Sequence, residues 1–292
     1  MKKIQYFKLF ESRTARLSDE EFINLVKTKC KDFLANPKYL QRMKKKYSGD
    51  YTYINPKLSY RAPLMADEMF SMGGVYSSHH TLLMDNLPSW KDFPKRTKSV
   101  IGSVNFGYDP SFGNHYHCVI PYDGANFALA PDCDLWNSYC LIGNNQYQFD
   151  DYFSESFLQA GISDDSYDEM IEDIQKLYNQ YLKGIDNSIS GYITRIFKQM
   201  KEDNVTDVAV AINDYFAPEK FRGLGPKNES KGFVTMNYSE ISNIQEKDFS
   251  GNLITHGKEF WTDSECLIVY LGNVSSKDIV YKRYEEVLKL LS

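Results

Sequence analysis

Strand-like segments are scattered among helical segments in this chain, without the regular strand–helix–strand alternation of a parallel sheet. β-Branched and aromatic residues cluster between turn signals at 98–105, 115–122, 233–238, 259–262 and 266–271. Apolar residues recur with a helical period at 167–181 and from 276 onward. This irregular order predicts an α+β fold. The chain has no Gly-x-Gly-x-x-Gly motif and no Walker lysine motif, which argues against a Rossmann unit and a P-loop.

The N-terminal part predicts a helical lead-in. Ser18 and Glu21 have the spacing of a capping box, and the apolar residues that follow fall on one helical face. Pro37 ends this helix and can begin another, whose apolar side would end at Met43. The predicted organisation is a helical segment at 1–50 and a larger domain at 51–292 with a helical insert at 151–200.

Composition narrows the class of protein. The chain has 292 residues, of which 42% are hydrophobic and 25% charged, as in a globular protein with a packed core. The net charge is −5, so the chain lacks the excess of basic residues that non-specific nucleic-acid binding needs. Five cysteines without a Cys-x-x-Cys pair predict reduced thiols. No apolar run could span a membrane and no secretory signal is present, so we expect a cytoplasmic protein that does not contact membranes.

Three stretches carry polar side chains at the ends of predicted strands. Arg61 closes the first, Ser59-Tyr60-Arg61. In the second stretch, Ser99 and Ser103 share one strand face, since side chains alternate along a strand. In the third, Glu259 and Glu265 each open an apolar strand.

In this order the stretches resemble the Arg–Ser–Glu layout of mono-ADP-ribosyltransferases, in particular those encoded by tailed bacteriophages. The resemblance covers about residues 55–272 and includes Pro94 with Arg96, Ser99–Ser103, Phe112-Gly113, Pro121–Gly124, Asp134–Trp136 and Glu259–Asp263. It implies a split β-sheet core and NAD as substrate. ADP-ribose would pass to a host protein or nucleic acid, with release of nicotinamide. The resemblance places this activity in the host cytoplasm, with packaging in the virion as an alternative.

The resemblance also implies a role for each candidate residue. Glu259 would be catalytic because it directly precedes the Trp segment, with Glu265 as the alternative and Ser103 as the central serine. Binding of NAD would involve Arg61, Ser99, Ser103, Tyr108 and Phe112. The chemistry agrees with these roles, because a carboxylate stabilises an oxocarbenium-like state. A guanidinium can hold a pyrophosphate with paired hydrogen bonds.

Two departures from the family pattern support a second hypothesis, a virion or host-interaction protein that keeps the fold without catalysis. The family's Ser-Thr-Ser run is Ser103-Val104-Asn105 here. Gly257 stands where arginine-directed members carry a second Glu or a Gln. A third hypothesis is a metal-dependent hydrolase that uses His115 and His117, which share a strand face. No further ligand has a metal-site spacing, so we expect no metal.

Overall fold

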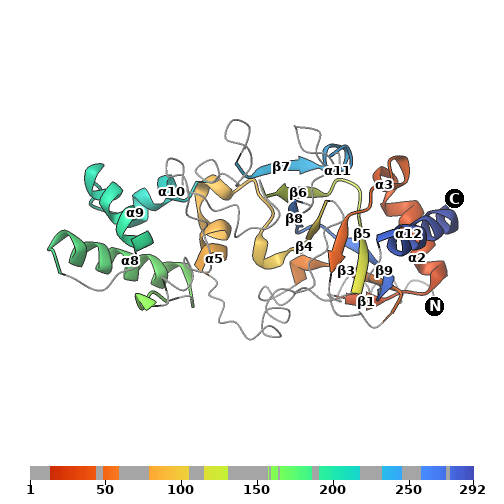
Figure 1. Ribbon diagram of the computed structural model, residues 1–292, viewed down its shortest axis with the longest axis horizontal. Helices are drawn as coiled ribbons and strands as arrows, with labels where there is room; N and C mark the ends of the chain where they lie inside the picture. Colours follow the sequence, from red (N-terminus) through yellow and green to blue (C-terminus); the bar gives the residue numbers. More distant parts are fainter. Residues whose placement is uncertain are drawn as a thin grey trace. The chain divides into compact units, whose positions relative to one another are not determined.

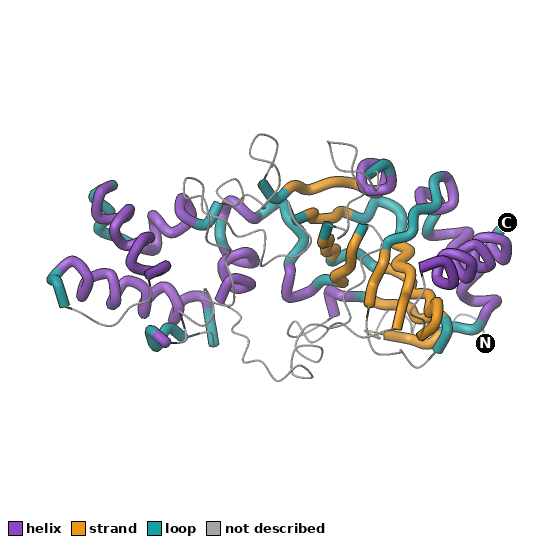
Figure 2. The backbone as a smooth tube through the Cα atoms, in the orientation of Figure 1, coloured by secondary structure: helices purple, strands orange, loops and turns teal. Residues whose placement is uncertain are grey.

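The computed structural model describes most of the chain in two compact units, each built from separate stretches of sequence. The described residues are 14–43, 49–58, 79–104, 115–130, 157, 159–163, 165–185, 191–217, 232–244, 258–273 and 277–292. The first unit combines Met1–Met72, Phe93–Cys133 and Val234–Ser292. The second combines Gly73–Asp92 and Asp134–Phe233. The described strands all belong to the first unit, and Figure 2 shows them in orange.

The first unit is built on an antiparallel sheet, and Figure 1 labels its strands except β2. The described strands are β1 (Thr14–Arg16), β2 (Gln41–Met43), β3 (Tyr51–Ile54), β4 (Val100–Ser103), β5 (His115–Pro121), β6 (Asn126–Leu129), β7 (Val234–Asn237), β8 (Glu259–Thr262) and β9 (Cys266–Asn273). Their order across the sheet is β1-β3-β9-β5-β2-β4-β8-β6-β7. With helices packed against it, this sheet confirms the predicted α+β class.

The sheet bends sharply between β2 and β4. These two strands pair only at Gln41 and Ser103, whereas β2 pairs with β5 over its whole length. Three residues connect β8 to β9, although four interstrand steps separate the two strands across the sheet. In a flat sheet those steps would need about 19 Å, more than the roughly 14 Å that the connection can reach. The sheet is therefore folded into two halves. In Figure 1, β7 is drawn horizontally and β5 nearly vertically.

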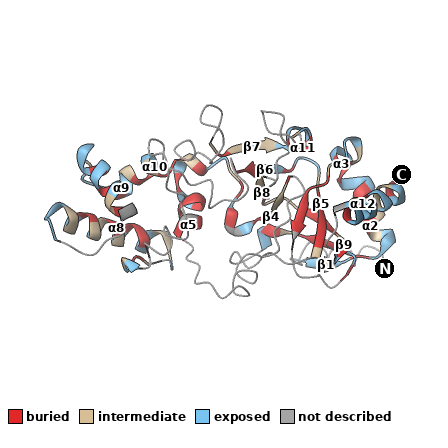
Figure 3. Cartoon of the chain, viewed as in Figure 1, coloured by how far each residue is buried: buried red, intermediate tan, exposed pale blue. Residues whose placement is uncertain are grey.

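Within the described residues of the first unit, four helices pack around this sheet: α2 (Asp19–Lys29), α3 (Lys31–Ala35), α11 (Tyr238–Ser242) and α12 (Lys277–Leu291). The capping box of α2 is confirmed. The Ser18 hydroxyl accepts from the Glu21 N–H at 3.3 Å, and the Glu21 carboxylate accepts from the Ser18 N–H at 2.9 Å. Phe22 of α2 is fully buried and stacks on Tyr51 of β3, with ring centroids 4.0 Å apart. Figure 3 shows the buried core along β3, β5 and β9.

The predicted second helix is wrong: residues 37–40 form neither helix nor strand, and residues 41–43 form β2. The apolar spacing that suggested a helix reflects the burial of Tyr39 and Leu40, and the Tyr39 ring packs on Tyr284 of α12. The Leu40 carbonyl accepts from the Val119 N–H at 2.8 Å, so pairing with β5 decides the local structure. The N-terminal lead-in thus contributes β1 and β2 to the sheet, as well as α2 and α3.

The described part of the second unit is helical, with α5 (His79–Asn86), α8 (Tyr167–Leu182), α9 (Gly191–Glu202) and α10 (Val208–Tyr215). Helices α8 and α9 were predicted as the mid-chain helical segment, and both are confirmed. Tyr178 of α8 packs on Phe197 of α9, with ring centroids 5.3 Å apart. Its hydroxyl donates a hydrogen bond to the Val205 carbonyl at 3.1 Å. Within the described residues, every helix is too short or too polar to cross a bilayer.

Candidate functional site

The predicted site residues fall into two groups. Arg61, Tyr108 and Phe112 lie outside the described residues, so their roles remain predictions. Their four companions are described and belong to the first unit: Ser99, Ser103, Glu259 and Glu265.

Ser103 and Glu259 lie opposite each other on β4 and β8. They are register partners in the antiparallel pair, so their side chains project from the same face of the sheet. The backbone around them is fixed by two hydrogen bonds. The Glu259 carbonyl accepts from the Ala130 N–H at 2.8 Å, and the Lys258 carbonyl accepts from the Val104 N–H at 3.0 Å. Both side-chain positions are half-buried, which leaves them partly accessible to solvent.

The two faces of β8 have different surroundings. Phe260 points into the apolar core, where its ring meets Phe127 edge-on at a centroid distance of 5.6 Å. Glu259 and Trp261 alternate with Phe260 and project from the other face. Trp261 is fully buried there, and its indole N–H donates to the Pro94 carbonyl at 3.0 Å. The segment around Pro94 therefore covers the face that carries the glutamate.

Arg96, in the 3₁₀ turn η3 (Arg96–Lys98), forms an ion pair with Glu259. Its Nη1 lies 2.7 Å from Glu259 Oε1, and the side chains are 1% and 14% exposed. The guanidinium carbon lies 5.1 Å from the centroid of the Trp261 ring. A buried charge needs a partner of opposite charge, and the carboxylate supplies it here. Sequence reasoning noted Arg96 only as part of the resemblance, because no local pattern pairs it with a residue so distant in the chain.

Ser99 supports the turn that carries Arg96. Its hydroxyl donates to the Lys95 carbonyl at 2.7 Å, and its side chain is buried. This hydrogen bond spans the 3₁₀ turn and orders the approach to β4. The structure thus assigns Ser99 a supporting contact, while its predicted role in binding NAD remains a prediction.

Glu265 lies beyond the other end of β8 from Glu259. Its carboxylate accepts a hydrogen bond from the Tyr53 hydroxyl. Burial is the larger cause, and this hydrogen bond the second, that raises the pKa of Tyr53 above its usual value. The residue of β8 nearest to Glu265 is Thr262, which pairs with Val100 at the far end of β4 from Ser103. The structure therefore brings Ser103 together with Glu259 and not with Glu265.

A second buried arginine, Arg42 of β2, contacts the same strand as Ser103. Its Nη1 donates to the Ile101 carbonyl of β4 at 2.5 Å, and the residue is only 3% exposed. The neighbouring Gln41 is the register partner of Ser103. Sequence reasoning missed Arg42 because this stretch was predicted to be helical, where Arg is an ordinary surface residue.

The histidine pair on β5 has partners other than a metal. His115 Nδ1 lies 3.0 Å from the Tyr270 hydroxyl. Burial and the positive charge of Arg42 lower the pKa of His117 to about 3, so this ring is neutral near pH 7. Among the described residues, no group of three or more His, Cys, Asp or Glu side chains could hold a metal ion.

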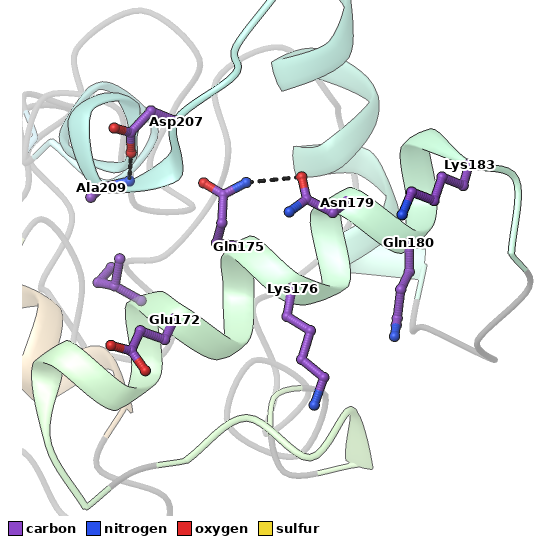
Figure 4. A pocket seen from close by; sticks show the side chains of 9 residues that line it. Glu172, Gln175, Lys176, Asn179, Gln180, Lys183, Asp207 and Ala209 are labelled. Atoms are coloured by element: carbon purple, nitrogen blue, oxygen red, sulfur yellow. Dashed lines mark hydrogen bonds between the residues drawn. The ribbon is translucent and has the colours of Figure 1, made fainter.

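The second unit has a groove of its own, shown in Figure 4. It has a volume of about 560 Å³ and lies along α8 and the beginning of α10. Gln175 crosses it, donating to Asn179 Oδ1 at 3.1 Å and accepting from the Val208 N–H at 2.7 Å. Its charged residues are all exposed: Glu172, Lys176, Lys183 and Asp207. Solvated charges of both signs do not single out a ligand or a reaction, so we place the candidate site at Ser103 and Glu259.

Comparisons of the chain with models of protein families, with curated proteins and with solved structures found no match.

Proposed function

We propose that the chain is an NAD-dependent ADP-ribosyltransferase of the phage type, with Glu259 as its catalytic carboxylate. The observation that carries the proposal is the cross-strand pair of Ser103 and Glu259, two half-buried polar residues far apart in the sequence. The resemblance pairs the same two residues. The folded antiparallel sheet is compatible with the split sheet that the resemblance implies.

Each group has a chemical task in the proposed reaction. The bond between nicotinamide and the ribose breaks, nicotinamide leaves with the bonding electrons, and positive charge develops on the ribose. The Glu259 carboxylate would hold a ribose hydroxyl and stabilise that charge. The Ser103 hydroxyl would orient the carboxylate from the neighbouring strand. The acceptor then bonds to the ribose carbon and loses a proton to solvent.

The proposal needs a guanidinium for the pyrophosphate, since paired hydrogen bonds from arginine suit phosphate oxygens. Arg61 is the residue that the resemblance implies. Replacing Arg61 by Met and measuring NAD affinity by calorimetry would test this role.

A direct test of the proposed function uses NAD labelled in the adenylate phosphate, mixed with the purified chain and a bacterial lysate. We expect nicotinamide release and transfer of the label to protein or nucleic acid. Digestion with protease or nuclease would then identify the class of acceptor. Absence of both nicotinamide release and label transfer, together with absence of NAD binding in calorimetry, would reject the proposal.

The ion pair with Arg96 favours a second candidate, a host-interaction protein without catalysis. Glu259 Oε1 already lies 2.7 Å from a buried guanidinium, which is the arrangement of a structural ion pair. Val104 also stands where the family has a threonine. If this candidate is correct, Glu259→Gln would leave the phenotype in infected cells unchanged, provided that the variant folds.

A further inference from the structure

We infer that Arg96, held in place by Trp261, is a positioning residue that fixes the direction of the Glu259 carboxylate. The inference rests on the proposed function, because it concerns how the catalytic carboxylate of that site is oriented. It assigns a task to the segment between Pro94 and Ser99, which the proposed chemistry does not otherwise use.

Three contacts hold the guanidinium in one place. The Trp261 indole N–H donates to the Pro94 carbonyl at 3.0 Å, which joins the segment to β8. The Ser99 hydroxyl donates to the Lys95 carbonyl at 2.7 Å, which closes the 3₁₀ turn around Arg96. The Arg96 guanidinium carbon lies 5.1 Å from the Trp261 ring centroid, within the range of a cation–π contact. The guanidinium is therefore tied to the strand that carries Glu259.

The two partners of the ion pair differ in their access to solvent. Arg96 is 1% exposed, whereas Glu259 is 14% exposed. The guanidinium is thus part of the interior, and the carboxylate lies at the boundary with solvent, where a ligand could reach it. Since Glu259 and Trp261 are two residues apart on β8, one planar guanidinium contacts both side chains.

Arginine suits this task better than lysine. Its guanidinium is planar and stays ionised, so it can lie near an aromatic ring and still pair with a carboxylate. The ammonium of lysine is a point charge that sets no plane. Arg96→Lys would therefore keep the positive charge but lose the geometry. A shift of about 1 Å in a catalytic group can lower the rate about 100-fold.

The test compares Arg96→Lys with wild type in three assays: melting temperature, NAD affinity by calorimetry, and nicotinamide release. We expect a folded variant with unchanged NAD affinity and KM, and a kcat lowered about 100-fold. Arg195→Lys, at an exposed position of α9, is the matched control and should keep the wild-type kcat. A normal kcat in Arg96→Lys would overturn the inference. So would a loss confined to KM, because it would make Arg96 a binding residue.

Trp261→Phe provides a second variant, in case Arg96→Lys does not fold. It keeps an aromatic ring beneath the guanidinium but loses the hydrogen bond to Pro94. We expect a fall in kcat in the same direction as for Arg96→Lys, with KM unchanged. An unchanged kcat would count against the inference.

If wild type releases no nicotinamide, the proposed function fails. The positioning role of Arg96 can then be tested by crystallography. The inference then predicts that the Glu259 carboxylate leaves its position opposite Ser103 in Arg96→Lys crystals. An undisplaced carboxylate would overturn the inference in its own right.

Discussion

Glu259 and Glu265 are similar in sequence, but their carboxylates have different partners. Glu259 meets a guanidinium on a sheet face that also carries Ser103, whereas Glu265 accepts from the Tyr53 hydroxyl beyond the far end of β8. Tyr53 is almost fully buried, so its hydroxyl and the Glu265 carboxylate form a contact within the folded chain. The contact gives Glu265 a structural role that does not depend on catalysis.

Tyr53→Phe tests that role. The substitution removes the hydroxyl that donates to Glu265, and a hydrogen bond to a charged group contributes about 1.5–3 kcal/mol. We expect the free energy of unfolding, measured with urea, to fall by about that amount while nicotinamide release stays at the wild-type rate. Tyr167→Phe at the half-exposed start of α8 is the matched control and should change stability little. A loss of activity at unchanged stability would instead place Glu265 in the site.

The buried His117 ring makes stability depend on pH. Burial and Arg42 lower its pKa from 6.5 to about 3 in the folded chain. The unfolded chain therefore takes up a proton first as the pH falls, and folded-state stability is lost below pH 6.5. Between pH 6.5 and about pH 4.5 this group should remove about 2 kcal/mol from the free energy of unfolding.

Urea unfolding at several pH values would check this prediction in wild type and in His117→Gln. The glutamine variant lacks the titrating ring, so its stability should fall less steeply on acidification. Equal slopes in the two proteins would show that His117 is not held neutral by its surroundings.

The sequence predicted which residues form the candidate site, but it did not predict which side chains contact one another. Ser103 and Glu259 were singled out because each belongs to a strand-like stretch in a known order. The partnership of Arg96 with Glu259 could not be predicted, since it depends on how the segment at Pro94 crosses β8. Arg42 was missed for a related reason. Residues 41–43 adopt the strand conformation because they pair with β5, which is distant in the sequence.

At the scale of elements, segments with a clear local pattern were predictable, whereas β2 was not. Helices α8 and α12 each carry several turns of apolar spacing, and β8 has the predicted bounds. β2 is three residues long and follows an apolar stretch that also fits a helix. Its conformation is set by partners that are distant in sequence, which outweigh local preference in strands this short.

The junction of β2, β4 and β8 depends on Gly102. A Cβ at this position would lie 2.4 Å from the Gln41 carbonyl oxygen and 2.7 Å from Phe260 Cζ. Backbone and a core ring would both have to move to accept a methyl group. The missing side chain therefore lets β2 approach β4 at the point where Gln41 pairs with Ser103.

Gly102→Ala should consequently lower the free energy of unfolding by about 1–3 kcal/mol, the usual range for overpacking. It should also reduce nicotinamide release, because Ser103 is the next residue. Gly184→Ala is the control: its φ of 70° strains a side chain, but nothing lies within 4 Å. That variant should lose about 1 kcal/mol without loss of activity. Wild-type stability in Gly102→Ala would contradict the close approach of β2.

At the scale of the whole molecule, both compact units are assembled from distant stretches of sequence. The first takes three stretches of the chain and the second takes two. The sheet follows the same principle, since β9 lies between β3 and β5. Sequence patterns predicted most of the strands but not their order across the sheet. That order depends on side-chain packing between segments that are distant in the sequence. The α+β class was predictable from the mixture of elements alone.

The proposed function depends most on Glu259 as the catalytic carboxylate. The measurement that tests it most directly is nicotinamide release from NAD by wild type, Glu259→Gln and Glu265→Gln, each checked for folding by its melting temperature. We expect release by wild type, a rate at least about 100-fold lower in Glu259→Gln, and near wild-type release in Glu265→Gln. Undiminished release by a folded Glu259→Gln variant, or none by wild type, would contradict it.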